Sequence, residues 1–277
     1  MCLKRPIQIS KKTSFVKQKS KSIFAKTRFT PNRNAMDALL KAGKDPMGAA
    51  IYDFHKTGKA GKLIVHSSMF DDDEIPVADL FRGFDKMPIL EQKALECATG
   101  SILDVGAGSG CHSLALQQMG KKCLAIDISE LSVKVMQERG LDARLVNLYD
   151  ESFVGQFDTI LMLMNGTGII GRLENMQKFF NRIKYLLAPG GQVIVDSSDL
   201  RYLYEEEDGS VMIDLADEYY GLLDYQMEYK GIIGESFDWI YVDFETLNYY
   251  AEQNGFKAEL IAEGEHYDYL ASLKMSC

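Results

Sequence analysis

The chain has 277 residues, enough for one large domain with additions, and its 46% hydrophobic and 10% aromatic content is ordinary for a protein with a packed core. The formal net charge of -9 is unevenly spread, because residues 1–35 hold ten Lys or Arg and no acid, which leaves 21 basic and 40 acidic residues in the remainder. The net negative charge of residues 36–277 repels phosphate backbones, which disfavours a nucleic-acid partner and favours a small-molecule substrate.

The cysteines and the hydropathy pattern bear on the compartment. The five cysteines are scattered and form no CxxC pair, which is typical of a reducing compartment. No apolar run reaches the roughly 18 residues that a membrane span needs. We therefore expect a cytoplasmic protein without a membrane partner, present as a monomer or homodimer.

Residues 1–35 are Lys-, Ser- and Thr-rich without a clear apolar period, so we predict a disordered basic tail. Three interpretations are open. The segment is dispensable or precedes a start at Met36, it is an organelle transit peptide, or it is a basic arm that contacts an anionic partner.

Residues 36–99 have a helical pattern with interruptions, and we predict an N-terminal helical cap over one end of a sheet. Short helices are expected at 36–42 and 47–55, followed by a break rich in glycine and lysine at 58–62. The acidic run 71–74 is predicted to be a loop, and 89–97 a further helix.

From Gly100 the pattern changes to alternating strands and helices, which predicts one α/β domain over 100–277. Such alternation implies right-handed crossovers and a doubly wound, mostly parallel sheet with helices on both faces. The predicted strands are 102–105, 123–126, 143–146, 157–164 and 192–195.

An insertion at 197–242 interrupts this alternation. Residues 223–229 alternate up to Lys230-Gly231, and 237–242 return, so a β-hairpin is predicted there. The alternation then resumes with a helix from Asp243 to Asn254 and two last strands at 257–262 and 267–275.

A glycine-rich loop, LDVGAGSG, joins the first strand of the domain to a helix, where open α/β sheets bind ligands. Gly106, Gly108 and Gly110 let the backbone approach a ligand and turn sharply. Asp104 precedes them and suits a cationic amino group, while Asp127, at the end of the second strand, can accept both hydroxyls of a ribose.

These features resemble the class I S-adenosylmethionine-dependent methyltransferase family over about 100–195 and again over 243–275. The carrying motifs are D-x-G-x-G-x-G at 104–110 with its acid at Asp127, and the LAPGG turn at 187–191. The resemblance implies the cofactor S-adenosyl-L-methionine and a seven-stranded Rossmann-like sheet with an antiparallel last strand. It also implies that the loop, including Ala107, cradles the methionine part, with Asp127 on the ribose and Ile128 beside the purine.

Further cofactor contacts are expected after the next strands. Where the family usually has an acid at the end of the third strand, this chain has Asn147, followed by Leu148, and Asp150 could substitute. Met164 ends the fourth strand, where the sequence continues Asn-Gly-Thr-Gly and lacks the prolines of exocyclic amine methyltransferases. Arg82 could clamp the cofactor carboxylate, or it is a surface arginine.

The residues that would act on the acceptor are less defined. Asp196 and Asp199 follow the fifth strand and are candidates for a base or for orienting the substrate, or else they cap the next segment. His266 begins the last strand and is a further candidate base. His112 follows the glycine loop, where a local structural contact is the expected role. No metal site is expected.

Aromatic residues concentrate after residue 200, including eleven of the fourteen tyrosines and the single tryptophan. We predict that the insertion is a lid over an apolar or aromatic acceptor, although a self-packed hairpin or a dimer surface is the alternative. The leading function is methyl transfer to a small molecule. The competing functions are a cofactor-binding protein whose lid binds a protein partner, and a nicotinamide oxidoreductase. The lid-forming side chains are Tyr204, Tyr219, Tyr220, Tyr225, Tyr229, Trp239 and Tyr241.

Overall fold

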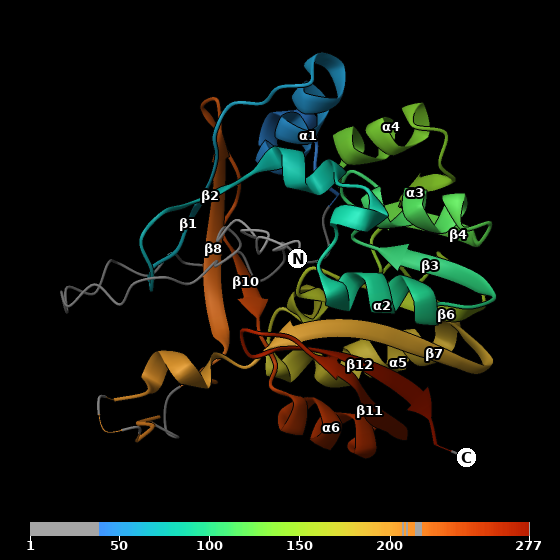
Figure 1. Ribbon diagram of the computed structural model, residues 1–277, viewed down its shortest axis with the longest axis vertical. Helices are drawn as coiled ribbons and strands as arrows, with labels where there is room; N and C mark the ends of the chain where they lie inside the picture. The colour runs from blue at the N-terminus through green and yellow to red at the C-terminus, as the bar shows by residue number, and fades with distance from the viewer. Residues whose placement is uncertain (1–38, 207, 209, 214–217, 277) are drawn as a thin grey trace, which may run out of the picture.

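The computed structural model describes residues 39–206, 208, 210–213 and 218–276, and these form two sheets (Figure 1). The larger sheet has seven strands in the order β11-β12-β7-β6-β3-β4-β5. Its strands are β3 (Ser101–Val105), β4 (Lys122–Asp127), β5 (Ala143–Leu145), β6 (Phe157–Met162), β7 (Leu187–Ser198), β11 (Phe256–Glu263) and β12 (Asp268–Met275).

The larger sheet has the predicted direction of strands. β3 pairs in parallel with both β4 and β6, and β5 and β7 extend the parallel order outward. β12 is antiparallel to its neighbours β7 and β11. The doubly wound, mostly parallel fold with an antiparallel last strand is therefore confirmed.

Helices cover both faces of the larger sheet because successive strand residues point to opposite sides. In β3, Leu103 packs with the apolar residues of α5 and α6, while Ile102 packs with those of α2 and α3. The helices are α2 (Ile89–Cys97), α3 (Cys111–Gln118), α4 (Glu130–Glu138), α5 (Met176–Leu186) and α6 (Phe244–Gln253). None of the described helices is long and apolar enough to cross a membrane.

The helix starts follow capping rules that local sequence encodes. The Asp243 side chain accepts a hydrogen bond from the backbone N–H of Thr246 and begins α6 as predicted. The Ser129 side chain does the same for α4 by accepting from Ser132. Both caps lie just after strands, so they fix where the chain turns from the sheet edge into the covering helix.

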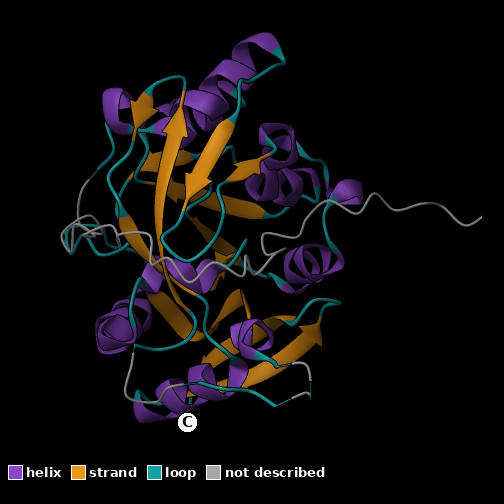
Figure 2. Cartoon of the chain, turned by 90° about the vertical axis from the view of Figure 1, so that its left-hand side faces the viewer, coloured by secondary structure: helices purple, strands orange, loops and turns teal. Residues whose placement is uncertain are grey.

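The second sheet joins parts of the chain that are far apart in sequence. Its order is β10-β8-β1-β2, with β9 paired to β8, and Figure 2 shows it in front of the larger sheet. The predicted hairpin is present, because β8 and β10 pair from Phe237–Tyr225 to Ile240–Leu222. The strands are β1 (Leu63–His66), β2 (Asp73–Ile75), β8 (Leu222–Tyr229), β9 (Ile232–Ile233) and β10 (Phe237–Ile240).

The prediction for residues 36–99 was therefore incomplete, because the segment is not wholly helical. It contains α1 (Pro46–Thr57), 3-10 turns and α2, but β1 and β2 lie between them. β1 has only four residues, a length at which helical and strand patterns are not distinguishable, and its partner β8 lies about 160 residues away. The helical segment and the insertion consequently share one small sheet.

The small sheet has two different faces. Its inner face carries Val65, Leu223, Tyr225, Phe237 and Trp239, which belong to one apolar cluster with α1 and the turn at Leu200–Tyr204. Its outer face carries the residues that alternate with these, among them Asp224 and Asp238. In Figure 1 the arrow of β3 points toward β8 and β10, so the small sheet stands across the carboxyl ends of the parallel strands.

Candidate functional site

The glycine loop after β3 has a backbone that only glycine adopts easily. Gly106, Gly108 and Gly110 have φ of 70°, 56° and 78°. The N–H groups of Gly106 and Ala107 both donate to the carbonyl of Ile126, at 2.9 and 3.2 Å, which ties the loop to the end of β4. The loop is thus a rigid backbone feature at the carboxyl ends of β3 and β4.

Asp127 is fixed by this loop. Its Oδ2 accepts the N–H of Gly108 and its Oδ1 accepts the N–H of Ser129, both at 2.8 Å. Burial raises the pKa of Asp127 to about 6, although these two N–H donors work in the opposite direction. Each carboxylate oxygen keeps a second lone pair, so the group can still accept hydrogen bonds from two hydroxyls.

The three glycines of the loop have different surroundings. A side chain at Gly110 would crowd Leu141 and Met136, with carbon separations of 2.5 and 2.8 Å, so this glycine allows α3 to pack near α4. Ala107 is buried in the same cluster as Met136. Gly106 instead faces Ile169 of the loop after β6, at 3.1 Å, and Gly108 faces α1 with a nearest contact of 3.9 Å. Gly106 and Gly108 therefore lie next to the loop after β6 and to α1, respectively.

Beneath the loop lies a buried charged network. Asp104 accepts a hydrogen bond from the Ser113 hydroxyl at 2.6 Å, and burial raises the pKa of its carboxyl. Glu91 of α2 accepts from Arg82 through Nε, at 3.2 Å, and through Nη2, and lies 2.9 Å from Nε2 of His112. Burial alone would raise the pKa of Glu91, but His112 and Arg82 outweigh it and lower that pKa.

These positions bear on two predicted residues. His112 is 4% exposed and held by Glu91, so its role is the local structural contact expected of it. Arg82 is not a surface arginine, because only 12% of its side chain is exposed and two of its nitrogens donate hydrogen bonds to Glu91. Its third nitrogen, Nη1, donates to the carbonyl of Asp79. The cofactor clamp proposed for it stays a prediction.

A strained turn follows β6 beside these groups. Met164 and Asn165 have φ of 65° and 62°, a region that side-chain-bearing residues rarely adopt. Asp196, at the end of β7, accepts the N–H groups of Met164 and Gly166 at 3.1 and 2.9 Å and so holds the turn. Burial raises the pKa of Asp196 to about 6. Strain of this kind is typical of functional sites.

The inner face of the small sheet packs directly on this turn. Gly168 lies so near Trp239 that an added Cβ would overlap three atoms of the indole. The hydroxyls of Tyr225 and Tyr241 are 3.2 Å apart, and burial raises the pKa of both, so both stay neutral. The negative charge of Asp196 contributes to the raised pKa of Tyr241. An aromatic surface with hydroxyl groups therefore faces the strand ends.

Comparison with known proteins identifies the family. A solved S-adenosylmethionine-dependent methyltransferase from Bacteroides fragilis, in complex with S-adenosyl-L-homocysteine, is 62% identical to the chain. The match covers 87% of this chain and 98% of that chain, with a TM-score of 0.82. The chain belongs to the S-adenosylmethionine-dependent methyltransferases.

Other matches agree with this assignment. Residues 102–191 match the methyltransferase domain family. The CcbJ methyltransferase of Streptomyces caelestis shares the fold at 16% identity, with a TM-score of 0.54 over 73% of this chain and 96% of that one. The cypemycin N-terminal methyltransferase of a Streptomyces species is 28% identical over 103 residues, which are 36% of this chain and 42% of that protein, so the chain spans less than half of that curated relative.

S-Adenosylmethionine is the cofactor of this methyltransferase, and the residues at the loop fit it. A cofactor without phosphate needs no anion site, and the loop offers carboxylates where a dinucleotide-binding loop offers backbone donors to a pyrophosphate. Asp127 is already oriented by two N–H donors, and Gly106 and Gly108 leave the space above the loop unfilled by side chains of their own. The family match sets aside the nicotinamide and non-enzyme alternatives.

The other predicted cofactor contacts follow β4 and β5 and have different surroundings. Asn147 is 7% exposed and its Oδ1 accepts the N–H of Tyr149 at 2.8 Å, while Leu148 is buried in the main core. The carbonyl of Ile128 accepts a hydrogen bond from the N–H of Leu40 at 2.7 Å, so the segment before α1 lies against the end of β4. Asp150 is exposed and its carboxylate accepts from Ser152, which gives it a role in a local turn.

The remaining acceptor-site candidates are placed differently from one another. Asp199 accepts the N–H and Nε of Arg201, at 2.9 and 2.7 Å, and the Tyr220 hydroxyl at 3.0 Å, which is the capping role considered for it. His266 is exposed. Because Asp268 pairs with Ser198, the start of β12 lies at the same edge as the cofactor loop, a point that the sequence left open.

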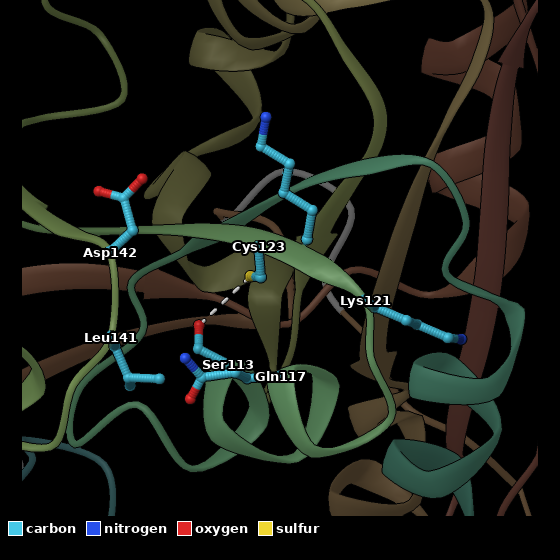
Figure 3. A pocket seen from close by; sticks show the side chains of 7 residues that line it. Ser113, Gln117, Lys121, Cys123, Leu141 and Asp142 are labelled. Carbon is cyan, nitrogen blue, oxygen red and sulfur yellow. Dashed lines mark hydrogen bonds between the residues drawn. The ribbon is translucent and has the colours of Figure 1, made fainter.

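Two features escaped the sequence analysis. Glu91 lies in α2 among Leu90, Ala94 and Leu95, and this single charge on an apolar stripe was the available signal of a buried partner. The contact between Trp239 and Gly168 left no local signal. A hollow of about 190 Å³ lies elsewhere, at the amino end of β4 (Figure 3), and is therefore separate from the cofactor loop. It is lined by Ser113, Gln117, Lys121, Lys122, Cys123, Leu141 and Asp142.

Proposed function

We propose that the protein transfers a methyl group from S-adenosylmethionine to a small-molecule acceptor held between the inner face of the small sheet and the strand ends. One observation carries the proposal. The aromatic inner face packs through Trp239 on Gly168, in the turn after β6, and β6 is the strand next to β3 and its glycine loop in the sheet order. Aromatic walls with a few polar groups are typical of sites for small organic ligands.

For the cofactor, we assign contacts to the residues that border the loop. Gly106 and Gly108 give room for its methionine part, Asp127 takes the ribose hydroxyls, and Ile128 borders the purine. Asn147, Leu148 and Met164 complete the assignment, while Ala107 and Gly110 shape the loop by packing behind it. Asp104 and Arg82 act from the buried network below, where Asp104 offers negative charge toward the cofactor amino group.

The chemistry needs little from the protein beyond position and environment. When bound, S-adenosylmethionine would supply an electrophilic methyl group on its positively charged sulfur, and S-adenosylhomocysteine would be released as an acceptor lone pair takes that methyl in line. The aromatic inner face excludes water and orients the acceptor, and the neutral Tyr225 and Tyr241 hydroxyls can donate to it or accept from it. We assign to Asp196, whose pKa burial raises to about 6, the role of receiving a proton that the acceptor loses.

We further propose that residues 36–99 and the insertion 197–242 act together as the cover of the methyltransferase domain 100–277. β1 of the first segment pairs with β8 of the second, and Tyr229 of β8 donates to Asp53 of α1 at 2.8 Å. Deleting 205–235 would remove β8, the strand that joins β1 to β10, so point substitutions test the cover better than a deletion.

The test is a screen of amines, phenols and thiols with methyl-labelled cofactor, read by mass spectrometry of the products. The curated relative is an N-terminal methyltransferase, which makes amines the first class to test. With the acceptor found, Trp239→Ala should lower kcat/KM at least tenfold and leave the affinity for S-adenosylhomocysteine within twofold.

Tyr249→Ala on α6 is the matched control, because this tyrosine is 58% exposed and lies outside the apolar cluster of the inner face. It should leave both quantities unchanged. Full turnover in Trp239→Ala would refute the proposed acceptor site, while loss of cofactor affinity in that variant would show that the indole belongs to the cofactor site instead.

A further inference from the structure

Two carboxylates lie opposite one another on the face of the small sheet that does not carry Tyr225 and Trp239. Asp224 of β8 and Asp238 of β10 are direct cross-strand partners. Directly opposed residues point to the same face with Cβ atoms about 5 Å apart. Asp224 is 1% exposed and the side chain of Asp238 is 8% exposed, so two acidic groups are buried side by side.

Each carboxylate has only one oxygen satisfied. Oδ1 of Asp224 accepts the N–H and hydroxyl of Ser68, at 3.0 and 2.8 Å, and the Ser67 hydroxyl at 3.4 Å. Oδ2 of Asp238 accepts from Nη1 of Arg172 at 3.0 Å. Oδ2 of Asp224 and Oδ1 of Asp238 are buried without a hydrogen-bond partner in the described part of the chain.

The nearby cation does not balance this charge. Arg172 contacts Asp238 and also Glu218 and Glu174, so one positive charge serves several carboxylates. Like charges directly opposite one another destabilise a sheet, and buried carboxylate oxygens are normally hydrogen-bonded. The arrangement thus lacks a positively charged group with N–H donors between Asp224 and Asp238.

We propose that Asp224 and Asp238 form a binding site for an organic cation with several N–H donors, a guanidinium above all. A guanidinium is planar and carries five donors, so it can bridge two carboxylates while each keeps its present partners. A metal ion fits less well, because no group of three or more His, Cys, Asp or Glu among the described residues is arranged to hold one.

Two sources can supply this chemistry, and the experiment separates them. Residues 1–35 carry ten Lys or Arg, so the chain has suitable side chains of its own, and a free cation is the other source. Methylguanidinium is the probe, titrated at low ionic strength into the full chain and into a variant that begins at Met36, with the melting temperature and binding heat as readouts.

We expect saturable binding of methylguanidinium that raises the melting temperature and is lost in the double variant Asp224→Asn/Asp238→Asn. The control variant Asp142→Asn removes a carboxylate that is 63% exposed and should bind as the parent does. Tetramethylammonium, which has the charge but no N–H donor, should not bind. At least tenfold tighter binding to the Met36 variant would identify the chain's own basic segment as the source, and equal binding would identify a free cation.

The proposal is overturned if neither chain binds methylguanidinium saturably, or if the double asparagine variant binds it as well as the parent. It is also overturned if tetramethylammonium binds equally, because charge alone would then account for the effect. None of these readouts depends on methyl transfer, so the result is independent of the acceptor.

Discussion

A single methyl group at position 168 offers a sharp test of how the small sheet is held over the strand ends. Gly168 is buried in the 3-10 turn Gly166–Ile170, and its backbone is one that alanine adopts without strain. The obstacle to alanine is purely steric, because its Cβ would overlap Cε2, Cδ2 and Nε1 of Trp239. Gly168→Ala must therefore displace either the indole of β10 or the turn after β6.

The expected cost follows from the size of this overlap. Insertion of a methyl group into a packed contact typically costs about 1–3 kcal/mol. For a protein of this size each kcal/mol lowers the melting temperature by about 2–4 °C, so a loss of roughly 2–12 °C is expected. Because Trp239 borders the proposed acceptor site, methyl transfer should fall while S-adenosylhomocysteine affinity, measured by calorimetry, is preserved.

Combining the change with Trp239→Leu tests the cause. A smaller side chain at 239 gives the new methyl room, so the cost of Gly168→Ala should shrink by at least half in that background, as non-additivity between contacting residues requires. Gly43→Ala is the control, since a Cβ there meets nothing within 4 Å. Equal costs of Gly168→Ala in both backgrounds would refute the reasoning, because the clash would then involve some other group.

Three further predictions concern the cofactor site and its buried charges. Asp127→Ala should weaken S-adenosylhomocysteine binding at least tenfold in calorimetry, whereas Asp150→Ala should not change it, and equal effects would contradict the ribose assignment. Arg82→Ala leaves the buried Glu91 without its guanidinium, so urea unfolding should show a loss of about 3 kcal/mol or more, and cofactor affinity should fall at least tenfold if Arg82 acts on it. Finally, because the pKa of Asp196 is raised to about 6 in the folded protein, above its usual value of 3.8, this group favours folding most below about pH 4 and loses that contribution as the pH rises through 6. Asp196→Asn should therefore flatten the decline in cofactor-free stability between pH 4 and 7, and an unchanged slope would assign the decline to other groups.

Much of the domain fold was predictable because its signals are local. The alternation of short apolar strands with amphipathic helices gave the order of the elements from β3 to β12, and Asp243 began α6 through a cap that needs only three neighbouring residues. The glycine loop was equally predictable from the sequence, since its left-handed backbone favours glycine at positions 106 and 108. Its position after a strand then located the cofactor site.

Other features depended on partners that the sequence does not place. Four residues of β1 become a strand because β8 supplies the hydrogen bonds, and Gly110 serves packing against Leu141 more than the ligand. The sharing of Glu91 by Arg82 and His112 likewise exists only once α2 and α3 are packed together.

Sequence by itself thus determined the class of fold, the cofactor loop and the family, because backbone preference, capping and hydrophobic period act over a few neighbouring residues. Only the tertiary structure decided which face of the hairpin meets the strand ends, what surrounds each glycine, and that Asp224 lies opposite Asp238. Those outcomes are set by packing and strand register between residues far apart in the chain, where one step of register would turn every side chain of a strand to the opposite face.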